Sequence, residues 1–205
     1  MTSVAIIDDH AMFRMGLKYL LSFQKDEFSF AGEYGQGEGA ADFVAKLKPD
    51  VLLLDIKMPE KDGIAVLHEV LFACPSQKVV MLTTSEADED IYRAITTGAR
   101  GYLLKDRDSD DVLTAIRTVT EGKRFFPPVV MDLFRRRQAM GDMTRREIDV
   151  LELLSQGLSN DEIGDKLGIG RNGVKSHLKN IFAKLEVDDR VTAATEAIRR
   201  GFIRR

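Results

Sequence analysis

Side chains able to bind a metal ion and carry a phosphoryl group recur in the first half of this sequence. Each directly follows a short apolar run, and they are Asp8 and Asp9, Asp55, Thr83 and Lys105. Carboxylates that lie close together repel one another unless a cation offsets their charge, and hard oxygen ligands suit Mg²⁺ or Mn²⁺. A carboxylate beside such an ion can attack phosphorus and form an aspartyl phosphate. Lys105 and the ion would neutralise the phosphoryl oxygens, and Thr83 can hydrogen-bond one of them.

The apolar runs that precede these residues are predicted to be buried parallel strands. They cover residues 4–7, 51–54, 79–82 and 101–104, and residues 28–34 form a further run. Segments with helical apolar spacing separate them, which is typical of an α/β doubly wound five-stranded parallel sheet with helices on both faces. Parallel strands present the same end, so the polar residues should converge at the carboxyl edge of the sheet, where such folds bind ligands.

A simpler interpretation takes the polar residues one at a time. Asp8 and Asp9 could cap the helix that follows, Asp55 could begin a turn before Pro59, and Lys105 could be a solvated surface residue. Four separate strands would then end in suitable residue types by chance, so a shared pocket is the favoured interpretation.

The composition is that of a globular protein. Apolar residues make up 44% and charged residues 31% of the 205 residues, which is too apolar for a disordered chain. No run approaches the ~20 apolar residues of a membrane span, so we expect a cytoplasmic protein with no membrane partner. Cys74 is the only cysteine, which excludes an internal disulfide.

The last third of the sequence predicts a separate, small all-α domain. Pro127 and Pro128 mark a boundary, and we expect a linker with a short helix over residues 122–142 between residues 1–121 and residues 143–205. Thr144 and Glu147 form a capping-box pattern before a first helix. Further helices over residues 161–167 and 171–185, joined by a turn that contains glycine, predict helix-turn-helix geometry.

The third of these helices has one apolar and one polar face. The apolar face carries Val174, Leu178, Ile181 and Leu185, and the polar face carries Asn172, Lys175, Ser176 and Lys179. The polar face could enter the major groove of double-stranded DNA, with lysines on guanine edges or phosphates. The alternative is a solvated basic face without a ligand.

Residues 1–121 resemble the flavodoxin-like receiver domain of a two-component response regulator. The matching motifs are Asp8-Asp9, Asp55 with Met58-Pro59 and Asp62-Gly63, Thr83-Thr84, and residues 101–105. The resemblance implies that Asp55 accepts a phosphoryl group from a sensor histidine kinase. It implies that Asp9 binds Mg²⁺ directly, that Asp8 acts mainly through water, and that the backbone carbonyl of Lys57 completes the ligands.

The same resemblance assigns further roles around the pocket. Thr83 and Tyr102 match the pair whose side chains reorient after phosphorylation, although Tyr102 could also be an ordinary half-buried aromatic residue of a strand. Lys105 matches the lysine that pairs with the phosphoryl group. Lys57 and Ser85 occupy positions where the family varies, and we expect them to influence the lifetime of the phosphoryl group.

Residues 143–205 resemble the LuxR-type DNA-binding domain, which makes the whole chain similar to regulators of the NarL/FixJ family. The motifs include residues 157–160, Glu162-Ile163, residues 174–177 and Lys184-Leu185. His177 is expected either to contact phosphate or to pack, and Arg190 to touch phosphate. The chain is expected to form a homodimer on activation, with a dimer contact from the last helix through Val191, Ala194, Ala197 and Ile198.

Departures from the family pattern leave two other functions open. Gly170 and Gly173 stand where the family usually has Ser and Thr, and Gly164 replaces the usual Ala, which should weaken the helices. The chain could therefore signal by protein contact, with a vestigial DNA-binding tail. A phosphohydrolase with an aspartyl nucleophile is disfavoured, because Lys57 stands where that class carries its general-acid aspartate.

Overall fold

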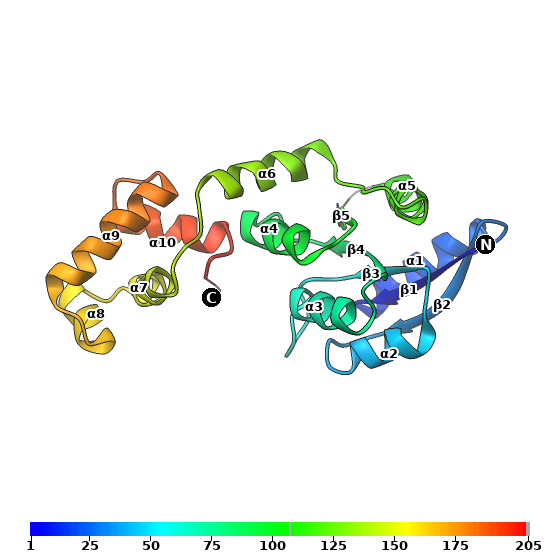
Figure 1. Cartoon of the computed structure of the whole chain (residues 1–205), viewed down its shortest axis with the longest axis horizontal. Helices are drawn as coiled ribbons and strands as arrows, with labels where there is room; N and C mark the ends of the chain where they lie inside the picture. Colours follow the sequence, from blue (N-terminus) through cyan, green and yellow to red (C-terminus); the bar gives the residue numbers. More distant parts are fainter. Residues whose placement is uncertain (107, 204–205) are drawn as a thin grey trace. The chain divides into compact units, whose positions relative to one another are not determined.

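The computed structural model describes residues 1–106 and 108–203, which form two compact units (Figure 1). The sheet unit comprises Met1–Glu86 and Asp90–Asp132, and the helical unit comprises Ala87–Glu89 and Leu133–Arg205. The division between residues 132 and 133 falls inside the segment 122–142. Residues 204 and 205 of the expected domain 143–205 lie outside the described residues.

The sheet unit contains a five-stranded parallel sheet in the order β2-β1-β3-β4-β5. Its strands are β1 (Thr2–Ile7), β2 (Phe28–Tyr34), β3 (Val51–Leu54), β4 (Lys78–Thr83) and β5 (Gly101–Leu104). The predicted fold class is thus confirmed. Apolar side chains on both faces of the central strands explain why these segments pair inside the sheet, since parallel strands are covered on both sides.

Helices alternate with the strands of this unit. They are α1 (Ala11–Phe23), α2 (Ala40–Leu47), α3 (Gly63–Ala73), α4 (Asp88–Thr97) and α5 (Ser109–Thr120). Alternate strand residues such as Val4, Ile6 and Leu53 share one core cluster with buried residues of α1 and α5. α2 and α3 pack against each other. The period-two alternation therefore assigns α1 and α5 to one face of the sheet.

The strand register brings the polar residues into one row. Ile7 pairs with Leu54, Leu54 with Met81, and Thr83 with Leu104, so neighbouring strands end at nearly the same level. The residues that follow β1, β3 and β5 must therefore meet at the carboxyl edge, as the sequence predicts.

The helices after α5 are α6 (Pro128–Ala139), α7 (Arg145–Ser155), α8 (Asn160–Leu167), α9 (Arg171–Leu185) and α10 (Arg190–Arg199). α7 to α10 enclose a single apolar core. Thr144 and Glu147 form the predicted capping box at the start of α7. Ser159 and Glu162 form a second one before α8. Among the described residues, no helix combines the length and apolar character needed to cross a membrane.

Candidate functional site

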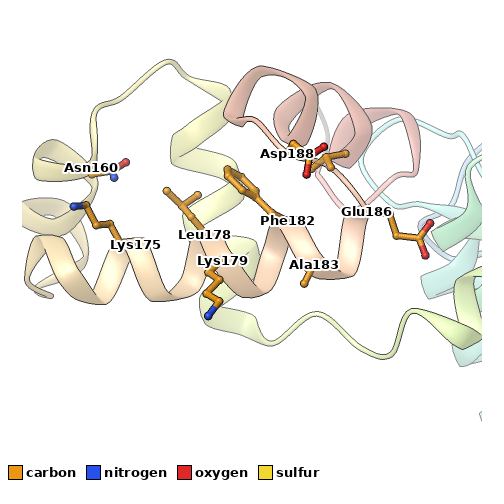
Figure 2. Close-up of a pocket in the computed structure, with 9 residues that line it drawn as sticks. Asn160, Lys175, Leu178, Lys179, Phe182, Ala183, Glu186 and Asp188 are labelled. Carbon is orange, nitrogen blue, oxygen red and sulfur yellow. The ribbon is translucent and has the colours of Figure 1, made fainter.

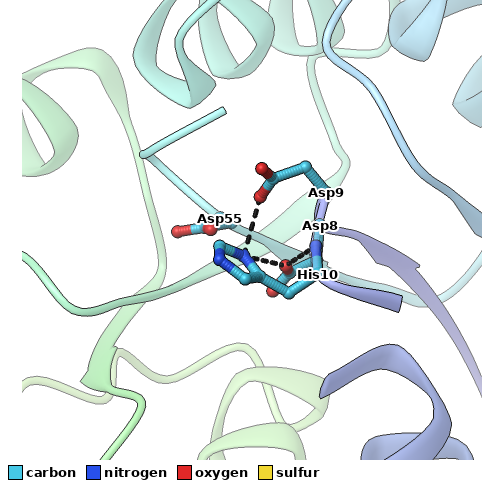
Figure 3. Close-up of side chains that lie close together, drawn as sticks. All are labelled: Asp8, Asp9, His10 and Asp55. Atoms are coloured by element: carbon cyan, nitrogen blue, oxygen red, sulfur yellow. Dashed lines mark hydrogen bonds and ion pairs between the residues drawn. The ribbon is translucent and has the colours of Figure 1, made fainter. Parts of the chain in front are cut away.

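The carboxyl edge of the sheet carries a group of acidic residues with one histidine. Asp8, Asp9 and His10 follow β1 and Asp55 follows β3, and one ligand atom from each lies within 4.8 Å of all the others (Figure 3). Asp8 and Asp55 are 2% and 1% exposed. Burying carboxylates in this way is costly unless cations or hydrogen bonds compensate them. The group therefore needs a positive partner.

Lys105 provides that partner for two of the carboxylates. Its Nζ atom lies 2.6 Å from Asp55 Oδ2 and 2.8 Å from Asp8 Oδ2. The same ammonium group lies 4.7 Å from the centre of the Phe13 ring, which provides a further cation–π contact. One cation thus bridges Asp8 and Asp55, and the structure brings together the three residues that the sequence predicts to meet.

Asp9 is the carboxylate of this group with which Lys105 forms no ion pair. Its Oδ1 atom is buried and has no hydrogen-bond partner. The His10 ring nitrogen lies 2.8 Å from this oxygen without forming a hydrogen bond. Buried acceptors are almost always satisfied, so an unsatisfied carboxylate oxygen beside two more acids favours a bound cation. Three carboxylates also match the oxygen ligands that Mg²⁺ prefers. The donor set fits a divalent ion.

Thr83 and Tyr102 are both fully buried behind this pocket. The Thr83 hydroxyl oxygen accepts a hydrogen bond from the Ser85 backbone N–H at 3.2 Å, and the Tyr102 hydroxyl donates to the Ser85 carbonyl at 2.8 Å. Burial, followed by the charges of Asp90 and Asp55, raises the pKa of the Tyr102 hydroxyl above its usual value. Tyr102 is therefore fully buried and not half-buried, and its reorientation with Thr83 stays a prediction.

Lys57 and Ser85 meet at a residue that sequence reasoning missed. Lys57 Nζ lies 2.6 Å from Asp90 Oδ2, and the Ser85 hydroxyl donates to the same oxygen at 2.6 Å. Asp90 is on α4 and is 1% exposed. Its position four residues before the buried Ala94 is the signal that could have indicated an inward-facing acid here. The Lys57 backbone N–H also donates to Asp55 Oδ1 at 3.2 Å.

In the helical unit, α9 separates its apolar and polar residues as predicted. Val174, Leu178, Ile181 and Leu185 belong to the core. Asn172, Lys175, Ser176 and Lys179 are exposed. A groove beside α9 is lined by Lys175, Lys179 and Asn160, and Glu186 and Asp188 lie at its other end (Figure 2). The exposed face of α9 thus carries Lys175 and Lys179 together with polar residues.

Other residues named for this unit have mixed positions. His177 is partly buried, and Arg190 is exposed and donates to the Leu158 carbonyl. Val191 is 71% exposed on α10, and Ala194 and Ile198 are partly buried. Ala197 has no exposed surface and packs in the core, so its assignment as a dimer contact requires correction. Its small side chain instead allows α10 to approach the rest of the unit.

Gly164, Gly170 and Gly173, which depart from the family pattern, have different surroundings in the structure. Gly170 precedes α9 and provides no side-chain cap, as expected. A Cβ atom on Gly164 would lie 2.6 Å from the Ile169 carbonyl oxygen, so this glycine permits the tight turn after α8. The expectation that Gly164 weakens its helix is corrected accordingly. At Gly173 the nearest atom would be 3.5 Å away, and a side chain has room.

Comparison with known proteins gives a family match for each of the two units. The family model for the response regulator receiver domain matches residues 4–117, and that for bacterial regulatory proteins of the luxR family matches residues 142–197. The transcriptional regulatory protein DegU of Brevibacillus brevis is 34% identical over 98% of this chain and 94% of its own length. The response regulator protein VraR of Staphylococcus epidermidis is 37% identical, with 98% of each chain covered.

A solved structure of RcsB from Salmonella enterica serovar Typhimurium, bound to a promoter in the presence of a phosphomimetic, is also similar. It is 25% identical, with a TM-score of 0.76, and covers 97% of this chain and 98% of that one. An acidic pocket on a parallel sheet, joined to a helix-turn-helix unit, defines a class of signalling proteins that receive a phosphoryl group and act on DNA. This chain belongs to the two-component response regulators of the NarL/FixJ family, which are DNA-binding transcription regulators.

Proposed function

We propose that Asp55 accepts a phosphoryl group from a sensor histidine kinase and that the aspartyl phosphate controls DNA binding by α9. The observation that carries this proposal is the position of Asp55. Its carboxylate ends a central strand and has Lys105 Nζ at 2.6 Å and two further acids beside it. Asp55 is thus a nucleophile already paired with the cation that a phosphoryl group requires.

In the transfer step, a carboxylate oxygen of Asp55 attacks phosphorus and forms the new O–P bond. The N–P bond to the donor histidine breaks, and the imidazole leaves and takes up a proton. Mg²⁺, held by Asp8, Asp9, Asp55 and the Lys57 carbonyl, would supply charge neutralisation for the phosphoryl oxygens. Lys105 pairs with the phosphoryl group, while Thr83 donates its hydroxyl to one of the oxygens.

Thr83 and Tyr102 connect the pocket to its surroundings. Both contact Ser85, Thr83 through the backbone N–H and Tyr102 through the carbonyl. When Thr83 turns toward a phosphoryl oxygen, the Ser85 N–H loses its acceptor and the segment that Tyr102 holds must readjust. Lys57 and Ser85 set the lifetime of the aspartyl phosphate, which water removes by autodephosphorylation.

The output is a dimer on double-stranded DNA. The regions involved are the receiver (residues 1–121), the linker (residues 122–142) and the DNA-binding domain (residues 143–205). Asn172, Lys175, Ser176 and Lys179 read the major groove, and Arg190 and His177 contact phosphate. Val191, Ala194 and Ile198 on α10 supply the dimer contact, which matches half-sites about one DNA turn apart.

The test is selection of bound sites from a random DNA pool, followed by gel shifts with the full chain. Wild type treated with acetyl phosphate and Mg²⁺ should bind the selected sites more tightly than untreated protein. Asp55→Asn should show no such gain. Equal affinity of treated and untreated wild type would exclude the coupling, and the absence of DNA binding by both would favour signalling by protein contact. Lys179→Ala should weaken binding, with exposed Lys166→Ala on α8 as the matched control.

A further inference from the structure

His10 joins the acidic pocket from the first residue after Asp9. Its Nδ1 atom lies 2.8 Å from Asp9 Oδ1 and 3.3 Å from Asp8 Oδ1. Its backbone N–H also donates to Asp8 Oδ1 at 2.8 Å, which holds the start of the residue against the pocket. Figure 3 shows the imidazole ring beside the Asp8 and Asp9 carboxylates. The ring nitrogen is thus directed at the oxygens that bind a cation.

The approach of His10 to Asp9 lacks the geometry of a hydrogen bond, and Asp9 Oδ1 remains unsatisfied. Two electron-pair donors at this separation are typical of ligands that share one ion. Ligands at about 2.0–2.1 Å from a metal are about 2.8–3.0 Å apart along an octahedral edge and about 3.3 Å apart along a tetrahedral one. The 2.8 Å separation of His10 Nδ1 and Asp9 Oδ1 matches an octahedral edge, whereas the 3.3 Å approach to Asp8 Oδ1 is a hydrogen bond that orients the ring.

The two oxygens of Asp8 are divided between two partners. Oδ2 faces Lys105 Nζ, and Oδ1 faces the imidazole of His10. Lys105 also uses Oδ2 of Asp55. The ammonium group therefore occupies one side of the pocket and leaves the side formed by His10, Asp9 and Asp8 Oδ1 available for an ion. The His10 side chain is 64% exposed, so an ion has access from solvent.

We propose that His10 is a nitrogen ligand in this pocket and gives it affinity for a first-row transition ion such as Co²⁺, Ni²⁺ or Zn²⁺. Imidazole nitrogen suits these ions, whereas Mg²⁺ prefers oxygen. The inference rests on the proposed cation role of the same pocket and deepens it. The pocket then holds Mg²⁺ through its carboxylates and holds a transition ion through the carboxylates together with His10. The two ions compete for one position.

The experiment is metal titration of the metal-free full chain by calorimetry, with Zn²⁺ and Mg²⁺ in separate runs. His10→Gln should weaken Zn²⁺ binding by about tenfold or more and change Mg²⁺ binding little. His68→Gln is the matched control and should bind both ions as wild type does, because His68 lies on α3 and is not in the group formed by Asp8, Asp9, His10 and Asp55. Unchanged Zn²⁺ affinity in His10→Gln would overturn the proposal.

A second readout uses the unaltered chain. In ¹⁵N-histidine-labelled protein, Zn²⁺ should shift the Nδ1 resonance of His10 and leave the resonances of His68 and His177 in place. A shift confined to His68 or His177 would assign the ion to another site. Labelling of Asp55 by acetyl phosphate with Mg²⁺, measured in wild type and in His10→Gln, reports separately on the proposed function. Labelling without a histidine effect on Zn²⁺ affinity would leave that function standing and remove this inference alone.

Discussion

Lys57 Nζ lies 2.6 Å from Asp90 Oδ2, and this ion pair connects the loop after β3 to helix α4. The same oxygen also accepts the Ser85 hydroxyl. Lys57 and Ser85, which are predicted to flank the pocket, thus both bind Asp90. Any substitution of Lys57 that removes its charge therefore also removes a contact of α4.

Lys57→Asn and Asp90→Asn should each speed autodephosphorylation several-fold. The first removes a side chain beside the pocket, and the second frees that side chain from its anchor. The double variant should resemble Lys57→Asn alone, because both changes break one interaction. The decay of acetyl-phosphate-labelled protein measures this. The control is Lys61→Asn. Lys61 lies in the same loop as Lys57, and its substitution removes ion pairs to Glu38 and Glu69 but should leave the rate unchanged.

Lys105→Gln should destabilise the metal-free chain by about 3 kcal/mol, because it leaves Asp8 and Asp55 buried without their shared cation. Saturating Mg²⁺ should restore more stability to this variant than to wild type. Urea unfolding with and without the ion gives both numbers. Lys123→Gln, whose side chain is 71% exposed, should change neither. An equal Mg²⁺ effect in all three proteins would contradict the assignment of the carboxylates.

The helical unit should lose stability in acid through Glu196. A hydrogen bond from Arg199 outweighs burial and, together with Arg200, lowers the pKa of Glu196 to about 2. A carboxyl whose pKa is depressed on folding stabilises the protein above its unfolded pKa of 4.5, and this contribution is lost as pH falls toward 2. Wild type should therefore exceed Glu196→Gln in unfolding free energy at pH 6, and the difference should vanish near pH 2. Glu152→Gln is an exposed control whose unfolding free energy should match that of wild type at pH 6.

Substitution by alanine at Gly164 and at Gly173 should change the stability of the helical unit in opposite directions. Gly164→Ala should destabilise the helical unit, because the new Cβ would meet the Ile169 carbonyl at 2.6 Å. Gly173→Ala should stabilise it by about 0.5–1 kcal/mol, since the site has room and alanine favours a helix. Thermal unfolding of the full chain distinguishes the two. Stabilisation by both substitutions would show that the turn after α8 relaxes easily.

Gly170→Ser should add a cap to α9 and stabilise it by a few tenths of a kcal/mol. If the missing cap limits DNA binding, the variant should also bind selected sites more tightly than wild type. Gel shifts at constant salt measure this, because protein–DNA affinity depends steeply on ionic strength. Gly170→Ala adds a side chain without a cap and serves as the control.

The sequence predicts the sheet well, because buried parallel strands must be apolar throughout. Only the polar strand ends Thr2, Ser3, Lys78 and Thr83 extend beyond the predicted runs. The convergence of Asp8, Asp55 and Lys105 was predictable for the same reason, since parallel strands end at one edge.

Contacts that depend on tertiary packing were not predictable. The burial of Asp90 depends on how α4 packs, and the direction of the His10 ring depends on the turn after β1. Ala197 looked like a surface residue because alanine at helical spacing carries no information about which face is covered. The clash at Gly164 arises from a carbonyl five residues away, which propensity scales ignore.

The carboxylate of Glu147 connects helices α7 and α9 of the helical unit. Glu147 Oε2 accepts hydrogen bonds from the Thr144 N–H, the Thr144 hydroxyl and Lys184 Nζ. Burial opposes ionisation there, but these bonds outweigh it and lower the pKa of Glu147. The first turn of α7 is thereby clamped to the last turn of α9. This clamp opposes unravelling of α9 at its last turn, so we expect regulation to change the accessibility of a folded α9 and not its folding.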